Sequence, residues 1–255
     1  MAQIIVLANQ KGGVGKTTTS INLGAALAQA GQRVLLVDID AQGNATSGSG
    51  VDKSLLEHDS YDVIVDVEQT PLHEVIVATD NYDLVPATIQ LSGAEIELAK
   101  QPQREYRLKT ALETVRDDYD FILIDNPPAL GLMTVNAFTA ADAILIPVQT
   151  EFYALEGLGQ LLNTIELVRQ QFNPDLDVAG ILLTMYDGRT NLAKQVAQEV
   201  RSYFDDKVYD TIIPRSVRLS EAPSYGQAII DFDPRSVGAQ MYNNLAQEVL
   251  KQYGK

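Results

Sequence analysis

Hydrophobic residues recur along this chain in two alternating patterns. Short, almost continuous apolar runs rich in Val and Ile are typical of strands buried on both faces of a sheet. Longer segments with apolar residues three and four positions apart indicate amphipathic helices. The predicted strands are Gln3–Ala8, Arg33–Val37, Tyr82–Pro86, Phe121–Ile124, Ala143–Val148, Gly180–Thr184 and Val208–Ile213. The predicted helices are Lys16–Ala30, Arg107–Val115, Leu155–Gln171, Leu192–Phe204 and Val237–Gln252.

This alternation of strands and helices predicts an α/β fold. Its sheet is mostly parallel and twisted, with helices on both faces. Because the sequence contains no repeat, no low-complexity segment and no linker rich in Pro, Gly or Ser, we expect a single domain over residues 1–255. Val51–Thr79 is the least regular part, and we expect surface connections and short helices there.

Composition narrows the class of protein. Of the 255 residues, 45% are hydrophobic and 21% charged, which is enough for an ordinary core and argues against disorder. The absence of cysteine excludes disulfides, thiolate catalysis and cysteine-bound metals. No apolar run reaches the roughly 18 residues of a membrane span, and the N-terminus lacks a secretory pattern. We therefore expect a soluble, cytoplasmic protein.

Charge is distributed unevenly. The formal net charge is −15, which argues against nucleic acid as a partner. Residues 1–183 hold 10 Lys and Arg against 25 Asp and Glu, whereas residues 184–255 hold 9 against 9. The C-terminal part therefore leaves room for a locally basic face. The alternative is an acidic surface that serves only solubility.

A glycine cluster separates the first predicted strand from the first predicted helix. Glycines let backbone N–H groups approach a phosphate chain, and a helix N-terminus adds partial positive charge, so this context predicts a P-loop. Lys16 would neutralise the β- and γ-phosphates of ATP, and the Thr17 hydroxyl would ligate Mg²⁺. The residues expected to bind nucleotide are Gly12, Gly13, Val14, Gly15, Lys16, Thr17 and Thr18.

A second lysine precedes the loop. Gln10 stands where the usual P-loop pattern has its first glycine, and the chain reads KGGVGKT from Lys11. This form resembles the deviant Walker A motif of the ParA/MinD family, a branch of the P-loop NTPases. The resemblance implies that Lys11 reaches the phosphates of the partner's nucleotide in a dimer. The alternative is a solvent-exposed lysine without such a role.

Two further strands end in carboxylates, at Asp38-Ile-Asp40 and at Asp125. In parallel sheets, ligands bind in the crevice at the carboxyl ends of the strands. Asp125 has the form of a Walker B aspartate and would hold Mg²⁺ through water. The family resemblance implies that Asp40 acts on the attacking water beside Lys11 and Lys16, and that Asp38 supports the metal region. Alternatively, Asp38 and Asp40 only cap a loop.

The resemblance extends from about Ile4 to Tyr242. The chain is similar to the Soj branch of ParA in VDIDAQGNATSG, YDFILIDNPPALGLMTVNA and IPRSVRLSEAPSYGQAI. This implies a Mg²⁺-dependent ATPase, slow alone and stimulated by a ParB-like partner, that acts in chromosome or plasmid partition. It also implies a homodimer in the ATP state that binds double-stranded DNA non-specifically and associates with the nucleoid.

The C-terminal part carries the remaining motifs. By resemblance, Arg189 and Arg218 would contact DNA, and Pro214 and Ser216 would contact the adenine. A MinD-like membrane-associated ATPase and a biosynthetic P-loop ligase are the competing functions. The ending NNLAQEVLKQYGK has few basic residues for an amphipathic membrane helix, which argues against membrane binding.

Overall fold

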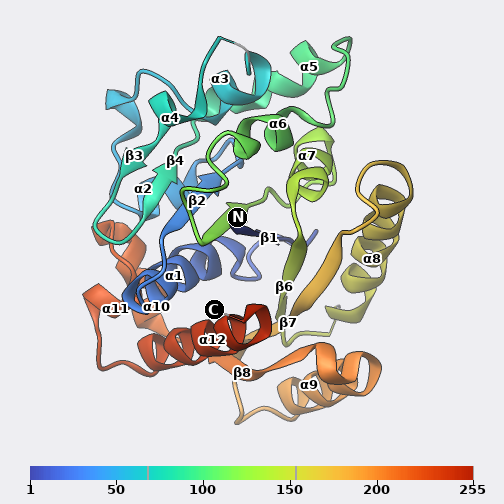
Figure 1. Cartoon of the computed structure of the whole chain (residues 1–255). Coiled ribbons are helices and arrows are strands. Elements are labelled where there is room, and N and C mark those ends of the chain that lie inside the picture. The colour runs from blue at the N-terminus through green and yellow to red at the C-terminus, as the bar shows by residue number, and fades with distance from the viewer. Residues whose placement is uncertain (68, 153, 255) are drawn as a thin grey trace.

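One sheet between two layers of helices forms the body of the molecule (Figure 1). The computed structural model describes residues 1–67, 69–152 and 154–254, without the side chain of residue 156. The strands are β1 (Gln3–Leu7), β2 (Val34–Asp38), β3 (Val77–Ala78), β4 (Asp83–Val85), β5 (Phe121–Asp125), β6 (Ala143–Gln149), β7 (Asp177–Tyr186) and β8 (Val208–Pro214).

The strand order β3-β4-β2-β5-β1-β6-β7-β8 places β1 in the interior of the sheet. All neighbouring pairs are parallel except β3 with β4. In this register Leu7 and Asp38 both lie opposite Asp125. The carboxyl ends of β1, β2 and β5 therefore meet at one edge, which we call the nucleotide edge.

Helices cover both faces of the sheet (Figure 1). The α-helices are α1 (Lys16–Gln29), α2 (Asn44–Gly48), α3 (Ser60–Val65), α4 (Leu72–Val75), α5 (Ala94–Leu98), α6 (Arg107–Glu113), α7 (Leu132–Ala140), α8 (Ala154–Gln171), α9 (Asn191–Phe204), α10 (Val217–Glu221), α11 (Ile229–Phe232) and α12 (Val237–Tyr253). The 3-10 turns are η1 (Lys53–Leu55), η2 (Ile89–Gly93), η3 (Asp205–Lys207) and η4 (Ala222–Tyr225).

The core is divided by the sheet. Successive side chains of a strand point to opposite faces. Ile5 and Leu7 accordingly pack with α1 and α12, whereas Ile4 and Val6 pack with the helices of the other layer. Both pairs are buried, as the continuous apolar runs predicted.

The structure confirms the α/β class and corrects several elements. β7 begins at Asp177, earlier than predicted, and α7 was not predicted at all. The α7 sequence LMTVNAFTA is apolar on most sides and buried, so it lacks the polar stripe that reveals an amphipathic helix. β3 has only two residues, too few to form a pattern. Gly31 has φ +87° and follows Ala30, the C-cap of α1, as expected of a helix-ending glycine.

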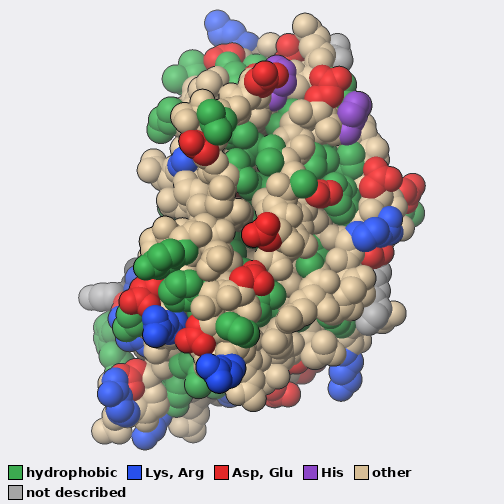
Figure 2. Space-filling view, turned by 90° about the vertical axis from the view of Figure 1, so that its left-hand side faces the viewer, with side chains coloured by type: hydrophobic (Ala, Val, Ile, Leu, Met, Phe, Trp, Pro, Cys, Tyr) green, Lys and Arg blue, Asp and Glu red, His purple; other side chains and the backbone are tan. Residues whose placement is uncertain are grey.

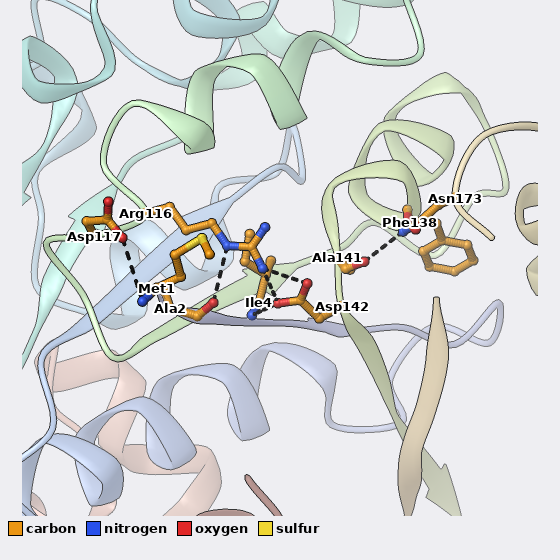
Figure 3. A network of polar contacts seen from close by, with 9 residues as sticks. All are labelled: Met1, Ala2, Ile4, Arg116, Asp117, Phe138, Ala141, Asp142 and Asn173. Carbon is orange, nitrogen blue, oxygen red and sulfur yellow. Dashed lines mark hydrogen bonds and ion pairs between the residues drawn. The ribbon is translucent and has the colours of Figure 1, made fainter. Parts of the chain in front are cut away.

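Polar contacts fix the opposite edge of the sheet, where the strands begin (Figure 3). Arg116 Nη2 donates to both carboxylate oxygens of Asp142, at 2.6 and 2.7 Å. Arg116 Nε donates to the carbonyl of Ala2 at 3.3 Å, and the amide of Ile4 donates to Asp142 at 2.8 Å. Beside them, Asn173 Nδ2 donates to the Phe138 and Ala141 carbonyls. These contacts hold the start of β1 against the start of β6.

Candidate nucleotide site

The glycine loop turns from β1 into α1 with two residues in the left-handed region. Gly13 has φ +73° and Gly15, the N-cap of α1, has φ +90°. Glycine adopts such angles without steric cost. At Gly12 and Gly13 a Cβ would meet no atom within 4 Å, so the loop borders open space. Exposed backbone beside a helix N-terminus is an arrangement suited to binding anions.

Lys16 is the first residue of α1, and its side chain is largely buried, with 7% of its surface exposed. Burial lowers the pKa of its ammonium group, while the carboxylates of Asp125 and Asp40 act in the opposite direction. Its Nζ lies 3.5 Å from the carbonyl oxygen of Lys11. The charge is therefore held inside the curve of the loop, bordering the cleft in front of it.

Asp125 ends β5 behind the loop and is fully buried. Thr17 Oγ1 donates to Asp125 Oδ2 and Ser20 Oγ to Asp125 Oδ1, both at 2.8 Å. Burial raises the pKa of Asp125 to about 6, against the lowering effect of these hydrogen bonds and of Lys16. Because the Thr17 hydroxyl donates a hydrogen bond to Asp125, the lone pairs of Thr17 Oγ1 remain available to a cation.

Asp38 ends β2 and is also buried. The amide and hydroxyl of Thr46 donate to Asp38 Oδ2 at 2.9 and 2.8 Å, and the amide of Asp40 donates to Oδ1 at 3.1 Å. Burial, followed by the charge of Asp125, raises the pKa of Asp38 to about 7. Both oxygens of Asp38 are thus engaged with the segment that carries Asp40.

Asp40 lies at the rim of the cleft in front of the loop. Its Oδ1 accepts the amide of Gln42 at 3.0 Å, and its carbonyl accepts the amide of Gly43 at 2.7 Å. The cleft has a volume of about 790 Å³. The cleft is lined by Gly12, Gly13, Gly15, Lys16, Thr17, Thr18, Ile21, Asp40, Gln42, Asn44, Ser47, Gly48, Pro128, Met185, Pro223 and Ser224.

A smaller cavity of about 150 Å³ adjoins the cleft at the C-terminal ends of β7 and β8. Pro214 and Ser216 line it, and Thr18 and Met185 line both spaces. The family resemblance assigned Pro214 and Ser216 to the adenine, and in the structure both residues line this smaller cavity next to the cleft.

Val14 differs from its neighbours in the glycine loop. Its side chain is buried, and its carbonyl accepts a hydrogen bond from Thr184 at 2.8 Å.

Lys11, directly before the glycines of the loop, pairs with Glu151. Its Nζ contacts Glu151 Oε2 at 2.7 Å, and both side chains are partly exposed. The Glu151 carboxylate also accepts a hydrogen bond from Gln149 at 2.5 Å. The lysine that precedes the loop is therefore paired on the molecular surface, whereas Lys16 is enclosed.

The site has the donor types that Mg²⁺ binds. Within the described residues no group of three or more His, Cys, Asp or Glu side chains forms a metal cage. A hydroxyl and a carboxylate beside a phosphate-binding loop instead match the few protein oxygens, waters and substrate phosphates that Mg²⁺ prefers. Thr17 and Asp125 fit this requirement.

Comparison with known proteins identifies the family. The AAA domain family matches residues 2–178. The chain is 61% identical over 251 residues to the sporulation initiation inhibitor protein Soj of Bacillus subtilis, covering 98% of both chains. It is 51% identical over 252 residues to the chromosome partitioning protein ParA of Caulobacter vibrioides, covering 97% of this chain and 94% of that one. The chain belongs to the Soj/ParA family of chromosome-partition ATPases.

Solved structures agree with this ParA-family assignment in fold. A cobyrinic acid a,c-diamide synthase from Mycobacterium smegmatis with bound ATP analogue and magnesium superposes with TM-score 0.88 at 38% identity. The match covers 100% of this chain and 97% of that one. The cell division ATPase MinD of Pyrococcus furiosus superposes with TM-score 0.80 at 26% identity, covering 98% and 99%.

Four polar residues that support the ParA-family site were missed at the level of sequence. Asn9 donates to the Pro147 carbonyl at 2.7 Å and accepts the Lys11 amide at 3.0 Å, which fixes the entry to the loop. The other three residues contact groups named above: Ser20, Thr46 and Thr184. Ser20 was the one open to prediction, because it follows Lys16 by four positions on the same helix face.

The two arginines assigned to DNA lie on the surface of the C-terminal third. Arg189 donates to both oxygens of Asp187, at 2.8 and 2.7 Å. Arg218 lies 3.1 Å from Glu221 and 3.6 Å from Asp233. On the face seen in Figure 2, basic and acidic side chains are intermixed over the lower part of the molecule. Each arginine is exposed but already paired.

Proposed function

We propose that this ParA-family protein is a switch that dimerises with ATP, binds DNA non-specifically in that state and releases it on hydrolysis. Its biological role is then chromosome or plasmid partition with a ParB-like partner. The observation that carries the proposal is the position of Lys11. Its ammonium pairs with Glu151 at the surface, so it is available to a second copy of the chain.

Within one copy, each group of the nucleotide edge has a separate task. Lys16 and the loop amides hold the phosphates, and Thr17 with Asp125 would hold Mg²⁺, Asp125 through water. The ion would draw charge from the γ-phosphate during its transfer to water. Asp40, whose amide donates a hydrogen bond to Asp38, directs the attacking water. The adenine occupies the cavity lined by Pro214 and Ser216.

In this proposal DNA binding depends on assembly. A neutral C-terminal third on an acidic chain offers a monomer few phosphate contacts, and a dimer doubles them. Arg189 and Arg218 supply such contacts by exchanging their carboxylate partners for phosphates. The acidic surplus of residues 1–183 attracts the basic segment of a ParB-like partner.

The decisive experiment measures binding of random-sequence DNA with Mg-ATP, Mg-ADP and no nucleotide. We expect DNA binding with Mg-ATP and not with Mg-ADP or without nucleotide. The Asp40→Ala variant should still bind ATP and should remain on DNA longer, because hydrolysis is blocked. Equal binding with ADP, or wild-type turnover by Asp40→Ala, would contradict the proposal.

Membrane association is the weaker alternative on structural grounds. The apolar face of α12 is buried against the body of the molecule, through Tyr242, Leu245, Val249 and other residues. No helix within the described residues has the length and apolar character to cross a membrane.

A ligase activity has one comparison in its favour, the diamide synthase named above. Such an enzyme would need an acceptor molecule and an amide donor for productive ATP turnover. Turnover that depends on DNA and a ParB-like protein, and is indifferent to added glutamine or ammonia, would separate the two functions.

A further inference from the structure

Lys53 lies ten residues beyond Gly43 in sequence and contacts the turn that carries Asp40. It opens η1 and is partly buried, lining a pocket of about 520 Å³ that shares Gln42 with the nucleotide cleft. Its Nζ donates to the carbonyl of Gln42 at 2.8 Å and to the carbonyl of Gly43 at 3.2 Å. Among the described residues Lys53 forms no ion pair within 4 Å of a carboxylate. The ammonium group is thus directed at the backbone of the turn.

Gly43 shows how tightly this turn is enclosed. It has φ +59°, and a Cβ placed there would lie 2.4 Å from the Ala87 carbonyl oxygen and 3.0 Å from Lys53 Cδ and Nζ. Only glycine fits between these groups. The turn is therefore held by Lys53 on one side and by the segment after β4 on the other.

The same turn determines where the Asp40 carboxylate points. One of its oxygens accepts the Gln42 amide, and the Gly43 amide closes the turn onto the Asp40 carbonyl. Both residues that restrain Asp40 in this way present their own carbonyls to Lys53. The Gly43 carbonyl also accepts the amide and the hydroxyl of Ser47, at 3.1 and 3.0 Å. Loss of the ammonium would therefore loosen the turn chiefly at Gln42, the residue whose amide restrains the Asp40 carboxylate.

We infer that Lys53 is a positioning residue for ATP hydrolysis, which it supports by holding the Asp40–Gly43 turn. This inference rests on the role proposed for Asp40. Misplacement of a reacting group by about 1 Å is enough to slow a reaction by about 100-fold. Lys53 donates to neither the glycine loop nor Thr17, so its contribution falls on turnover and not on nucleotide affinity.

Lys53→Met tests this, because it keeps the unbranched shape and most of the length of the side chain and removes the donor. We expect single-turnover hydrolysis to slow about tenfold, with ATP affinity within about twofold of wild type. Lys53→Arg, which restores a charged donor, should recover most of the rate. Lys100→Met is the matched control, since Lys100 is an exposed lysine far along the chain from the turn, and it should hydrolyse normally.

Hydrogen exchange over residues 39–48 gives a second measurement that does not depend on turnover. Lys53→Met should exchange faster there than wild type, and Lys53→Arg should not. Unchanged exchange, or hydrolysis within twofold of wild type, would overturn the inference. An equal loss of affinity and rate, not restored by arginine, would show a structural role only.

Asp40→Ala separates failure of this inference from failure of the proposed function. If Asp40→Ala is inactive and Lys53→Met is normal, only the role of Lys53 is wrong. If Asp40→Ala hydrolyses ATP like wild type, the role of Asp40 and the inference both fail.

Discussion

The nucleotide edge and the arginine-bearing surface satisfy their charges in different ways. At the nucleotide edge Lys16, Asp38 and Asp125 are buried. The two carboxylates accept hydrogen bonds from residues of α1 and α2, and the Lys16 ammonium donates to the carbonyl of Lys11. On the C-terminal surface Arg189 and Arg218 keep 89% and 58% of their side chains exposed and pair with carboxylates on nearby loops and helices.

The difference concerns how readily each region exchanges partners. Breaking a buried charged contact leaves an uncompensated charge and costs about 3–5 kcal/mol. An exposed ion pair contributes only about 0.2–1 kcal/mol, so a phosphate can replace its carboxylate at little cost. The contacts of the nucleotide edge are therefore costly to break, whereas the ion pairs of Arg189 and Arg218 can be exchanged for other partners at little cost. The predictions below test this contrast.

The largest effect is expected at the nucleotide edge. Lys16→Ala removes the charge that faces the phosphates and should weaken ATP binding by more than about 100-fold. Titration with a fluorescent ATP analogue would measure this, and Lys100→Ala is the control. ATP affinity close to wild type in Lys16→Ala would mean that the loop does not bind phosphate.

Replacement of the paired arginines should have an intermediate effect. Arg189→Ala and Arg218→Ala should each lower DNA affinity by roughly tenfold at moderate salt, while ATP binding and ATP-driven dimerisation persist. Each lost phosphate contact also lowers the slope of log affinity against log salt by about 0.9. Lys109→Ala is the control in the acidic part of the chain. Wild-type DNA binding by both arginine variants would place the DNA surface elsewhere.

Removing a carboxylate partner should act in the opposite direction and more weakly. Glu221→Gln releases Arg218 from one of its two acidic neighbours, and we expect DNA affinity to rise by roughly two- to threefold. Glu199→Gln changes the net charge equally, at an exposed position on α9. A rise of the same size in both variants would indicate a general charge effect and not release of Arg218.

A separate test of the buried carboxyl groups is the pH dependence of stability without nucleotide. Both Asp38 and Asp125 have pKa values raised by burial, so the folded state binds protons more tightly than the unfolded state. Their contribution is complete below about pH 4 and is lost as pH rises towards 7. Urea denaturation should show the unfolding free energy falling by on the order of 2 kcal/mol between pH 5 and 7.5. A rise over that interval would contradict the burial of these carboxyl groups.

The residues that the sequence assigns to the nucleotide edge lie together in the structure, and they could be found because the segments that carry them are local in the chain. The strand before the loop, the glycines and the helix after it are adjacent in the chain, and a strand that ends in Asp125 is visible in a single run. The supports of the site were not predictable in this way. Thr46 and Lys53 act through contacts with Asp38 and Gly43 that depend on how α2 and η1 fold back.

The arginine surface shows a second limit. Motif resemblance identified Arg189 and Arg218, and charge counting placed them in the neutral third of the chain. Neither method showed that each has a carboxylate partner. The partner of Arg189 is two residues away, but Asp233 reaches Arg218 from beyond η4, through the tertiary fold.

The interior position of β1 has a consequence for synthesis of the chain. β1 leaves the ribosome well before its neighbours β5 and β6, which begin only at Phe121 and Ala143. At about 5–20 residues per second, the strand that leads into the phosphate loop waits on the order of ten seconds for its first partner. During that interval the N–H and C=O groups along both of its edges have no neighbouring strand, so β1 is open to pairing with other chains early in translation.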